Sequence, residues 1–122
     1  MGKDILVVED NPDNLKLVTW ILEDEGYTVT AAGSGEECLN LTQHHDFDLI
    51  LMDISLPGMD GKETTRQLRQ SDAYRNKPII ALTAHAIKGE DDEIRRSGVT
   101  DLITKPLDEE KLLICLAQFT DG

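Results

Sequence analysis

The sequence has few cysteines and no long apolar run. Cys38 and Cys115 are the two cysteines in 122 residues, and they form neither a C-x-x-C pair nor part of a Cys/His cluster. Two isolated cysteines favour a reducing compartment over a disulfide framework, and we expect both to lie in the core. No apolar run approaches the ~20 residues that span a bilayer, and the first ten residues, MGKDILVVED, lack the pattern of a secretory signal. We therefore expect a cytoplasmic protein that does not enter membranes.

Basic residues are scarce relative to acidic ones. Lysine and arginine number 12 against 24 aspartates and glutamates, which gives a net charge of −12. This charge repels the phosphates of nucleic acids and anionic lipid head groups, so direct binding to either is not expected. The length suits a single hydrophobic core, and we predict one domain over residues 1–122.

Short apolar runs alternate with segments of helical spacing along the whole chain. The runs predict five strands, at residues 4–8, 27–32, 48–52, 78–82 and 101–104. Helix starts are indicated by Asn11 with Pro12, by Ser34 and Asp60 with a glutamate three residues later, and by Asp108. Helix ends are indicated by Gly26 and Gly98. The alternation predicts an α/β fold, with a doubly wound five-stranded parallel sheet covered by helices on both faces.

Polar residues follow four of the predicted strands. Glu9 and Asp10 follow the first, Asp53 the third, Thr83 the fourth and Lys105 the fifth. Ligands of doubly wound sheets bind at this carboxyl edge, where the strand order reverses. If the first and third strands are neighbours, three carboxylates converge, and two such charges ~4 Å apart repel by ~4 kcal/mol at an effective dielectric constant of ~20. A cation must offset this repulsion, and oxygen ligands without histidine or cysteine favour Mg²⁺.

These residue types also suit phosphoryl transfer. A carboxylate can act as a nucleophile and form an aspartyl phosphate. A lysine supplies positive charge to phosphoryl oxygens, and a threonine hydroxyl donates a hydrogen bond. Asp53, Lys105 and Thr83 can divide these roles.

Four ordered segments resemble the receiver domains of two-component response regulators. They are ILVVEDNPDN at 5–14, DLILMDISLPGMDG at 48–61, PIIALTAHA at 78–86 and LITKPLD at 102–108. Together they span nearly the whole chain. The resemblance implies a flavodoxin-like (βα)5 fold with strand order 2-1-3-4-5.

The resemblance also implies a role for each residue at the carboxyl edge. Asp53 would accept a phosphoryl group from a phosphohistidine of a sensor histidine kinase or a histidine phosphotransfer protein. Mg²⁺ would be held by Glu9, Asp10, Asp53 and the backbone carbonyl of Ser55. Such a protein is a signalling phosphoacceptor rather than an enzyme, although it assists its own phosphorylation and slow dephosphorylation.

The same resemblance describes how the signal leaves the site. Lys105 would contact the phosphoryl group, and the Thr83 hydroxyl would move toward it as the switch. The Lys105–Pro106 bond would be cis, and a downstream protein would bind the face formed by the fourth helix and the fifth strand. One residue departs from the family pattern, because Leu102 stands where an aromatic residue is common. Leucine cannot make the same ring rotation or hydroxyl contact.

Other functions remain open from the sequence. A haloacid-dehalogenase-like phosphotransferase carries a second aspartate two residues after its nucleophile, where this chain has Ser55. A flavodoxin-like carrier would bind the FMN phosphate in its first loop, which here reads EDNPDN and repels phosphate. A receiver-like adaptor that is never phosphorylated is the remaining alternative. Trp20 is expected to be partly buried under the first helix, with a docking face for a helical partner as the second interpretation.

Overall fold

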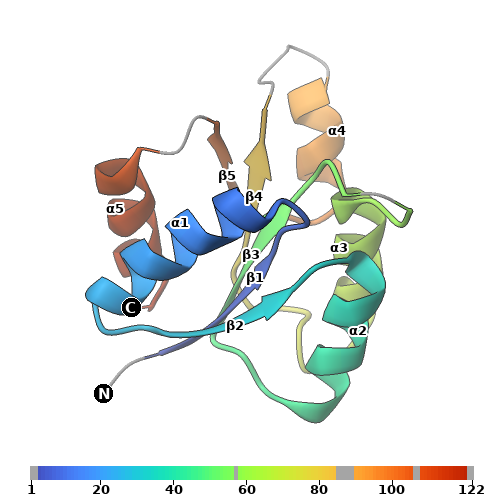
Figure 1. The fold of residues 1–122 in the computed structure, drawn as a ribbon. Coiled ribbons are helices and arrows are strands. Elements are labelled where there is room, and N and C mark those ends of the chain that lie inside the picture. The colour runs from blue at the N-terminus through green and yellow to red at the C-terminus, as the bar shows by residue number, and fades with distance from the viewer. Residues whose placement is uncertain (1–2, 57, 85–89, 106–107, 121–122) are drawn as a thin grey trace.

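The computed structural model describes residues 3–56, 58–84, 90–105 and 108–120. Within these residues, five strands alternate with five helices, and Figure 1 shows how they are arranged. The strands are β1 (Asp4–Val8), β2 (Thr28–Ala32), β3 (Leu49–Asp53), β4 (Ile79–Thr83) and β5 (Asp101–Thr104). The helices are α1 (Pro12–Asp24), α2 (Gly35–His44), α3 (Gly61–Arg69), α4 (Glu90–Arg96) and α5 (Glu109–Thr120). The predicted alternation is confirmed.

The five strands form one parallel sheet in the order β2-β1-β3-β4-β5. Helices α1 and α5 lie on one side of the sheet and α2 and α3 on the other (Figure 1). The chain order reverses between β1 and β3, so their carboxyl ends form the switch point of the sheet. The predicted fold class and strand order are confirmed.

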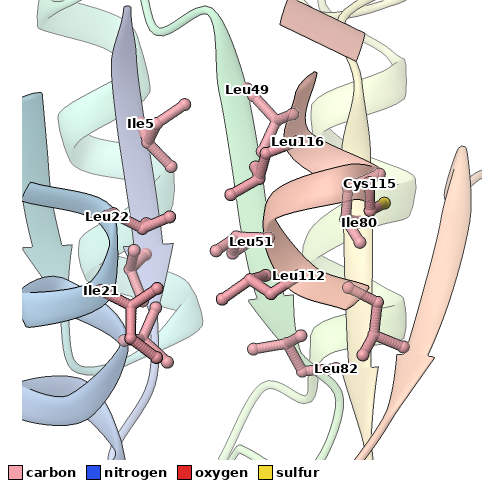
Figure 2. Packing of buried hydrophobic residues seen from close by; sticks show 13 residues of the cluster. Ile5, Ile21, Leu22, Leu49, Leu51, Ile80, Leu82, Leu112, Cys115 and Leu116 are labelled. Atoms are coloured by element: carbon pink, nitrogen blue, oxygen red, sulfur yellow. The ribbon is translucent and has the colours of Figure 1, made fainter. Parts of the chain in front are cut away.

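The core consists of two main apolar clusters, one on each side of the sheet. In β1, Ile5 and Val7 belong to the cluster under α1 and α5, whereas Leu6 and Val8 belong to the cluster under α2 and α3. Figure 2 shows side chains of α1 and α5 packed toward the central strands in the first cluster. Because β1, β3 and β4 are apolar on both faces, the carboxyl ends of these strands are held by packing from both sides.

The predicted helix boundaries agree with the caps in the structure. The Asn11 side chain accepts hydrogen bonds from the backbone of Asp13 and Asn14 at the start of α1. Equivalent side-chain caps are formed by Ser34, Asp60 and Asp108. Gly26 and Gly98 have φ values of 92° and 112°, as expected for left-handed helix ends.

The predictions of burial for the two cysteines and for the tryptophan have different outcomes. Cys38 and Cys115 are buried and free, which confirms their predicted place in the core. The prediction that Trp20 is partly buried is wrong, because its position on α1 points outward and leaves the residue 64% exposed.

None of the helices in the described part of the chain combines the length and apolar character of a membrane span.

Candidate functional site

Asp53 and Thr83 are the last residues of β3 and β4, rather than the first residues after them. The parallel pairing continues through Asp53 opposite Leu82 and through Thr83 opposite Thr104. The predicted strands therefore ended one residue too early. Because both residues take part in the sheet, the sheet itself sets the positions of their backbones.

Three carboxylates meet at the carboxyl edge of the sheet. One oxygen each from Glu9, Asp10 and Asp53 can be chosen so that all lie within 4.8 Å of one another. Glu9 and Asp53 are only 2% and 3% exposed, whereas Asp10 is exposed. The Asn11 backbone N–H donates to Glu9 Oε2 at 3.2 Å, and the Ser55 N–H donates to Asp53 Oδ1 at 2.9 Å. The predicted convergence of carboxylates from the first and third strands is thus observed.

Lys105 contacts both buried carboxylates. Its Nζ lies 3.3 Å from Glu9 Oε1 and 3.3 Å from Asp53 Oδ2. Burial alone would lower the pKa of Lys105, but the attraction of Asp53 and Glu9 outweighs burial and raises the pKa. Lys105 is therefore a charged ammonium in this site.

The charge at this edge is not balanced by the one lysine. Burial, followed by a hydrogen bond and charge repulsion from Asp53, raises the pKa of Glu9 to about 7. The hydrogen bond from Asn11 and the attraction of Lys105 only partly oppose this shift. A buried carboxyl held so far from its usual pKa of 4.5 indicates a site that lacks positive charge. Clustered carboxylate oxygens fit Mg²⁺, which prefers such ligands and keeps several of its waters.

The start of α3 packs directly against Asp53. The Gly61 N–H donates to the Ile54 carbonyl at 3.2 Å. A Cβ atom on Gly61 would lie 2.4 Å from the Asp53 carbonyl oxygen and 2.8 Å from the Ile54 Cα. Only glycine fits there, so α3 can approach the end of β3 closely. This role of Gly61 is not among the predictions from the sequence, although a glycine directly after the cap residue Asp60 is a visible signal.

Thr83 and Lys105 are joined through the backbone. The Lys105 N–H donates to the Thr83 carbonyl at 2.7 Å, which places the lysine beside the end of β4. Thr83 is 3% exposed. The structure thus brings Thr83 to the same edge as the carboxylates. Ser55 is exposed two residues beyond Asp53, and Pro106 lies outside the described residues, so the cis bond stays a prediction.

Leu102 belongs to a third, smaller apolar cluster. It packs against the cluster of buried Ile54, Ala81 and Ile94, which lie directly after β3, in β4 and in α4. The position that is commonly aromatic in receiver domains therefore makes an aliphatic contact near α4 in this protein.

The structure is a doubly wound α/β sheet with buried carboxylates and a lysine at its switch point, which defines a class of small domains with an acidic carboxyl edge. The family model for the response regulator receiver domain matches residues 5–117. The chain belongs to this family.

Relatives come from both sensor proteins and separate response regulators. Sensor protein GacS of Pseudomonas syringae pv. syringae is 44% identical over 119 residues, which cover 95% of this chain and 13% of that protein. The response regulator DivK of Brucella ovis is 43% identical over 107 residues, which cover 88% of this chain and 87% of DivK. The chain thus spans about an eighth of the sensor protein and most of DivK.

Solved structures agree with this assignment. The receiver domain of sensor histidine kinase PA1611 from Pseudomonas aeruginosa superposes with a TM-score of 0.94 at 35% identity, with both chains fully covered, and carries a magnesium ion in its active site cleft. Chemotaxis response regulator CheY4 of Vibrio cholerae gives a TM-score of 0.92 at 31% identity and covers 98% of this chain and 99% of its own. The chain is a receiver domain of phosphorelay signalling, and the phosphotransferase and adaptor alternatives are not favoured.

Proposed function

We propose that Asp53 is the phosphoacceptor and takes a phosphoryl group from a phosphohistidine. The observation that carries this proposal is the contact of Lys105 Nζ with both Asp53 and Glu9 at 3.3 Å, beside a third carboxylate, Asp10. Residues 1–122 act as one receiver domain. A cytoplasmic location is supported by two thiols that are buried and free, which suits a reducing compartment.

The proposed reaction needs little covalent chemistry from the protein. A carboxylate oxygen of Asp53 attacks phosphorus, the phosphorus–nitrogen bond breaks, and its electron pair returns to the imidazole of the donor. Ser55 N–H and Lys105 hold Asp53 through its two oxygens, which orients the nucleophile. Lys105 also neutralises part of the charge on the phosphoryl oxygens.

Mg²⁺ is the proposed cofactor, with Glu9, Asp10, Asp53 and the Ser55 carbonyl as its ligands. When bound, it reduces the repulsion between the anionic nucleophile and the anionic donor. The protein contributes by keeping Glu9 and Asp53 buried, where Lys105 offsets only part of the cost of their charges. The same arrangement assists slow dephosphorylation.

Phosphorylation changes the face formed by α4 and β5, the output face, through Thr83. The phosphoryl group adds negative charge and acceptor oxygens, which attract the Thr83 hydroxyl and Lys105. Thr83 ends β4, directly before the connection to α4, so its movement biases α4 and the neighbouring β5 between two arrangements. Leu102 joins these elements through packing with Ile94, and a downstream protein binds this face.

The phosphodonor docks beside α1. A mainly apolar groove there is lined by Pro12, Leu15, Thr19, Trp20 and Ala31, together with the charged residues Lys16 and Glu23. Pro12 of this groove lies two positions after Asp10 in the chain, and Trp20 is the type of large, exposed side chain that anchors interfaces. A sensor histidine kinase or a histidine phosphotransfer protein is the expected partner.

Phosphorylation by acetyl phosphate tests the proposed acceptor. With Mg²⁺, the wild type is expected to gain one phosphoryl mass, and Asp53→Asn to gain none. Asp46→Asn, which alters an exposed carboxylate just before β3, is the control and should react like the wild type. A wild type without an adduct, or an adduct in Asp53→Asn, contradicts the proposal. Steady release of phosphate from varied esters would support the phosphotransferase alternative instead.

Transfer from a phosphorylated histidine phosphotransfer protein tests the docking face. Trp20→Ala should slow this transfer about tenfold or more, because truncation of an anchor residue lowers the binding affinity by at least this factor. The variant should react normally with acetyl phosphate, which needs no docking. Ile114→Ala removes another exposed apolar side chain, on α5, and should behave like the wild type in both reactions. Equal transfer by Trp20→Ala and the wild type contradicts docking at this groove.

A further inference from the structure

Ile94 and Arg95 are among the described side chains that attach α4 to the rest of the molecule. Ile94 is fully buried in the small cluster with Ile54 and Ala81. Arg95 lies 4.0 Å from Asp101 of β5, at the limit of an ion pair. Because α4 has only seven residues and this small cluster beneath it, it belongs to the less stable parts of the fold.

The C-terminal end of α4 is held firmly by Arg69 of α3. The Arg69 guanidinium donates to the carbonyl of Gly98, two residues after the helix, at 2.8 Å. It also donates to the carbonyls of Tyr74 and Lys77 at 2.7 and 2.6 Å, and to Thr100 Oγ1 at 3.2 Å. One side chain therefore joins the end of α4 to two neighbouring loops. If α4 moves, we expect it to pivot about this end.

A second link joins the middle of α4 to the start of α3. Lys62 Nζ donates to Glu93 Oε1 at 3.0 Å, and the two residues are 31 positions apart in the chain. Lys62 is 18% exposed and Glu93 55%. Lys62 follows Gly61, whose close packing on Asp53 fixes this turn of α3 to the end of β3. The salt bridge thus connects a fixed point beside the acceptor residue to a weakly held helix.

We propose that the Lys62–Glu93 salt bridge holds α4 in its unphosphorylated arrangement and opens when Asp53 is phosphorylated. The proposal rests on the phosphoacceptor function of Asp53 given above. Lys62 stays with β3 whereas Glu93 moves with α4, so a pivot about the Arg69 end separates the two charges. Each state-specific contact biases a two-state equilibrium by its own free energy. The loss of a partly exposed ion pair changes the equilibrium constant between the two arrangements by a factor of about two to five.

Beryllofluoride with Mg²⁺ measures this bias, because it mimics the phosphoryl group on the acceptor. Lys62→Met keeps the aliphatic stem and removes the charge, and Glu93→Gln removes the opposite charge. Each should lower the apparent dissociation constant for beryllofluoride about two- to fivefold, since the inactive arrangement loses a contact. Arg66→Met is the matched control, because it removes the Arg66–Glu63 pair of the same helix without touching α4. Its dissociation constant should equal that of the wild type.

Hydrogen exchange gives a second readout that does not depend on phosphorylation. Without beryllofluoride, backbone amides of residues 90–97 should exchange about two to five times faster in Lys62→Met than in the wild type. The amides of α1 and of the C-terminal half of α3 should not change. The charge-reversed double variant, with Lys62→Glu and Glu93→Lys, should return both readouts toward wild-type values.

The two proposals fail in different ways. A wild type that does not respond to beryllofluoride contradicts the phosphoacceptor function itself. A wild type that responds, together with Lys62→Met and Glu93→Gln variants that match Arg66→Met, contradicts only the role of the salt bridge. Weaker beryllofluoride binding by the two variants also overturns it, because the pair would then stabilise the activated arrangement.

Discussion

Replacement of Glu9 by glutamine is expected to stabilise the metal-free protein at neutral to alkaline pH. Burial and the neighbouring Asp53 raise the pKa of Glu9 from 4.5 to about 7 in the folded state. The folded state therefore binds more protons than the unfolded state between pH 4.5 and 7, and stability from this group falls as the pH rises through that range. The shift corresponds to a loss of about 3 kcal/mol above pH 7.

Glutamine resembles the protonated form of Glu9. It carries no charge, its oxygen can accept the Asn11 N–H bond, and its amide can donate to Asp53, although the hydrogen bond from Lys105 to this side chain is lost. Glu9→Gln should thus exceed the wild type in free energy of unfolding by up to about 3 kcal/mol at pH 8, and by much less at pH 5. Mg²⁺ should reduce the difference in free energy of unfolding at pH 8. The ion stabilises the charged site of the wild type, whereas the variant lacks one of the proposed ligands.

Urea denaturation in EDTA at pH 5 and pH 8 measures this difference directly. Glu23→Gln, an exposed position on α1, controls for the change in net charge and should have little effect at either pH. Equal destabilisation of the protein by Glu9→Gln at both pH values would contradict this prediction. That result would mean that Glu9 is ionised throughout and stabilises the fold through its ion pair with Lys105.

Three further predictions follow from the site and its supports. Mg²⁺ affinity, measured by calorimetry, should fall up to about tenfold for each pH unit below 7, because Glu9 must lose its proton to bind the ion. Gly61→Ala should cost about 1–3 kcal/mol in urea denaturation and weaken Mg²⁺ binding, since the added Cβ meets the Asp53 carbonyl; Gly33→Ala, with open space around it, should be nearly neutral. Tyr74→Phe should cost about 1–3 kcal/mol in the same assay, because the Tyr74 hydroxyl accepts from the buried Phe47 N–H at 3.1 Å; an unchanged midpoint would mean that another group replaces it.

The fold and the carboxyl-edge residues could be predicted because each depends on local sequence patterns. Strand and helix periods, cap residues and the positions of Asp53 and Lys105 after apolar runs are all visible in short segments. The rule that ligands bind where the strand order reverses then brings these segments together. The one-residue error at Asp53 and Thr83 arose because polar residues are read as strand ends, whereas pairing with neighbouring strands continues through them.

Features that depend on tertiary contacts could not be predicted in the same way. Arg69 reaches mostly backbone carbonyls, which every residue carries, so no sequence pattern marks its partners. The Lys62–Glu93 pair joins two helices whose relative placement is known only from the structure. Trp20 was expected to be partly buried on the basis of its residue type, but its position on α1 turns it toward solvent.

The contact between Lys105 and Glu9 joins residues 96 positions apart. During synthesis, the three carboxylates emerge from the ribosome long before the lysine that partly neutralises them. A nascent chain that has reached β4 carries the acidic residues without this counter-charge, and it cannot yet make the Lys105 contact to Asp53. The ability to receive a signal that we propose for this domain is therefore acquired only after β5 and Lys105 have emerged and β5 has joined the sheet. An N-terminal fragment that ends before Lys105 cannot form the contacts of this lysine with Glu9 and Asp53.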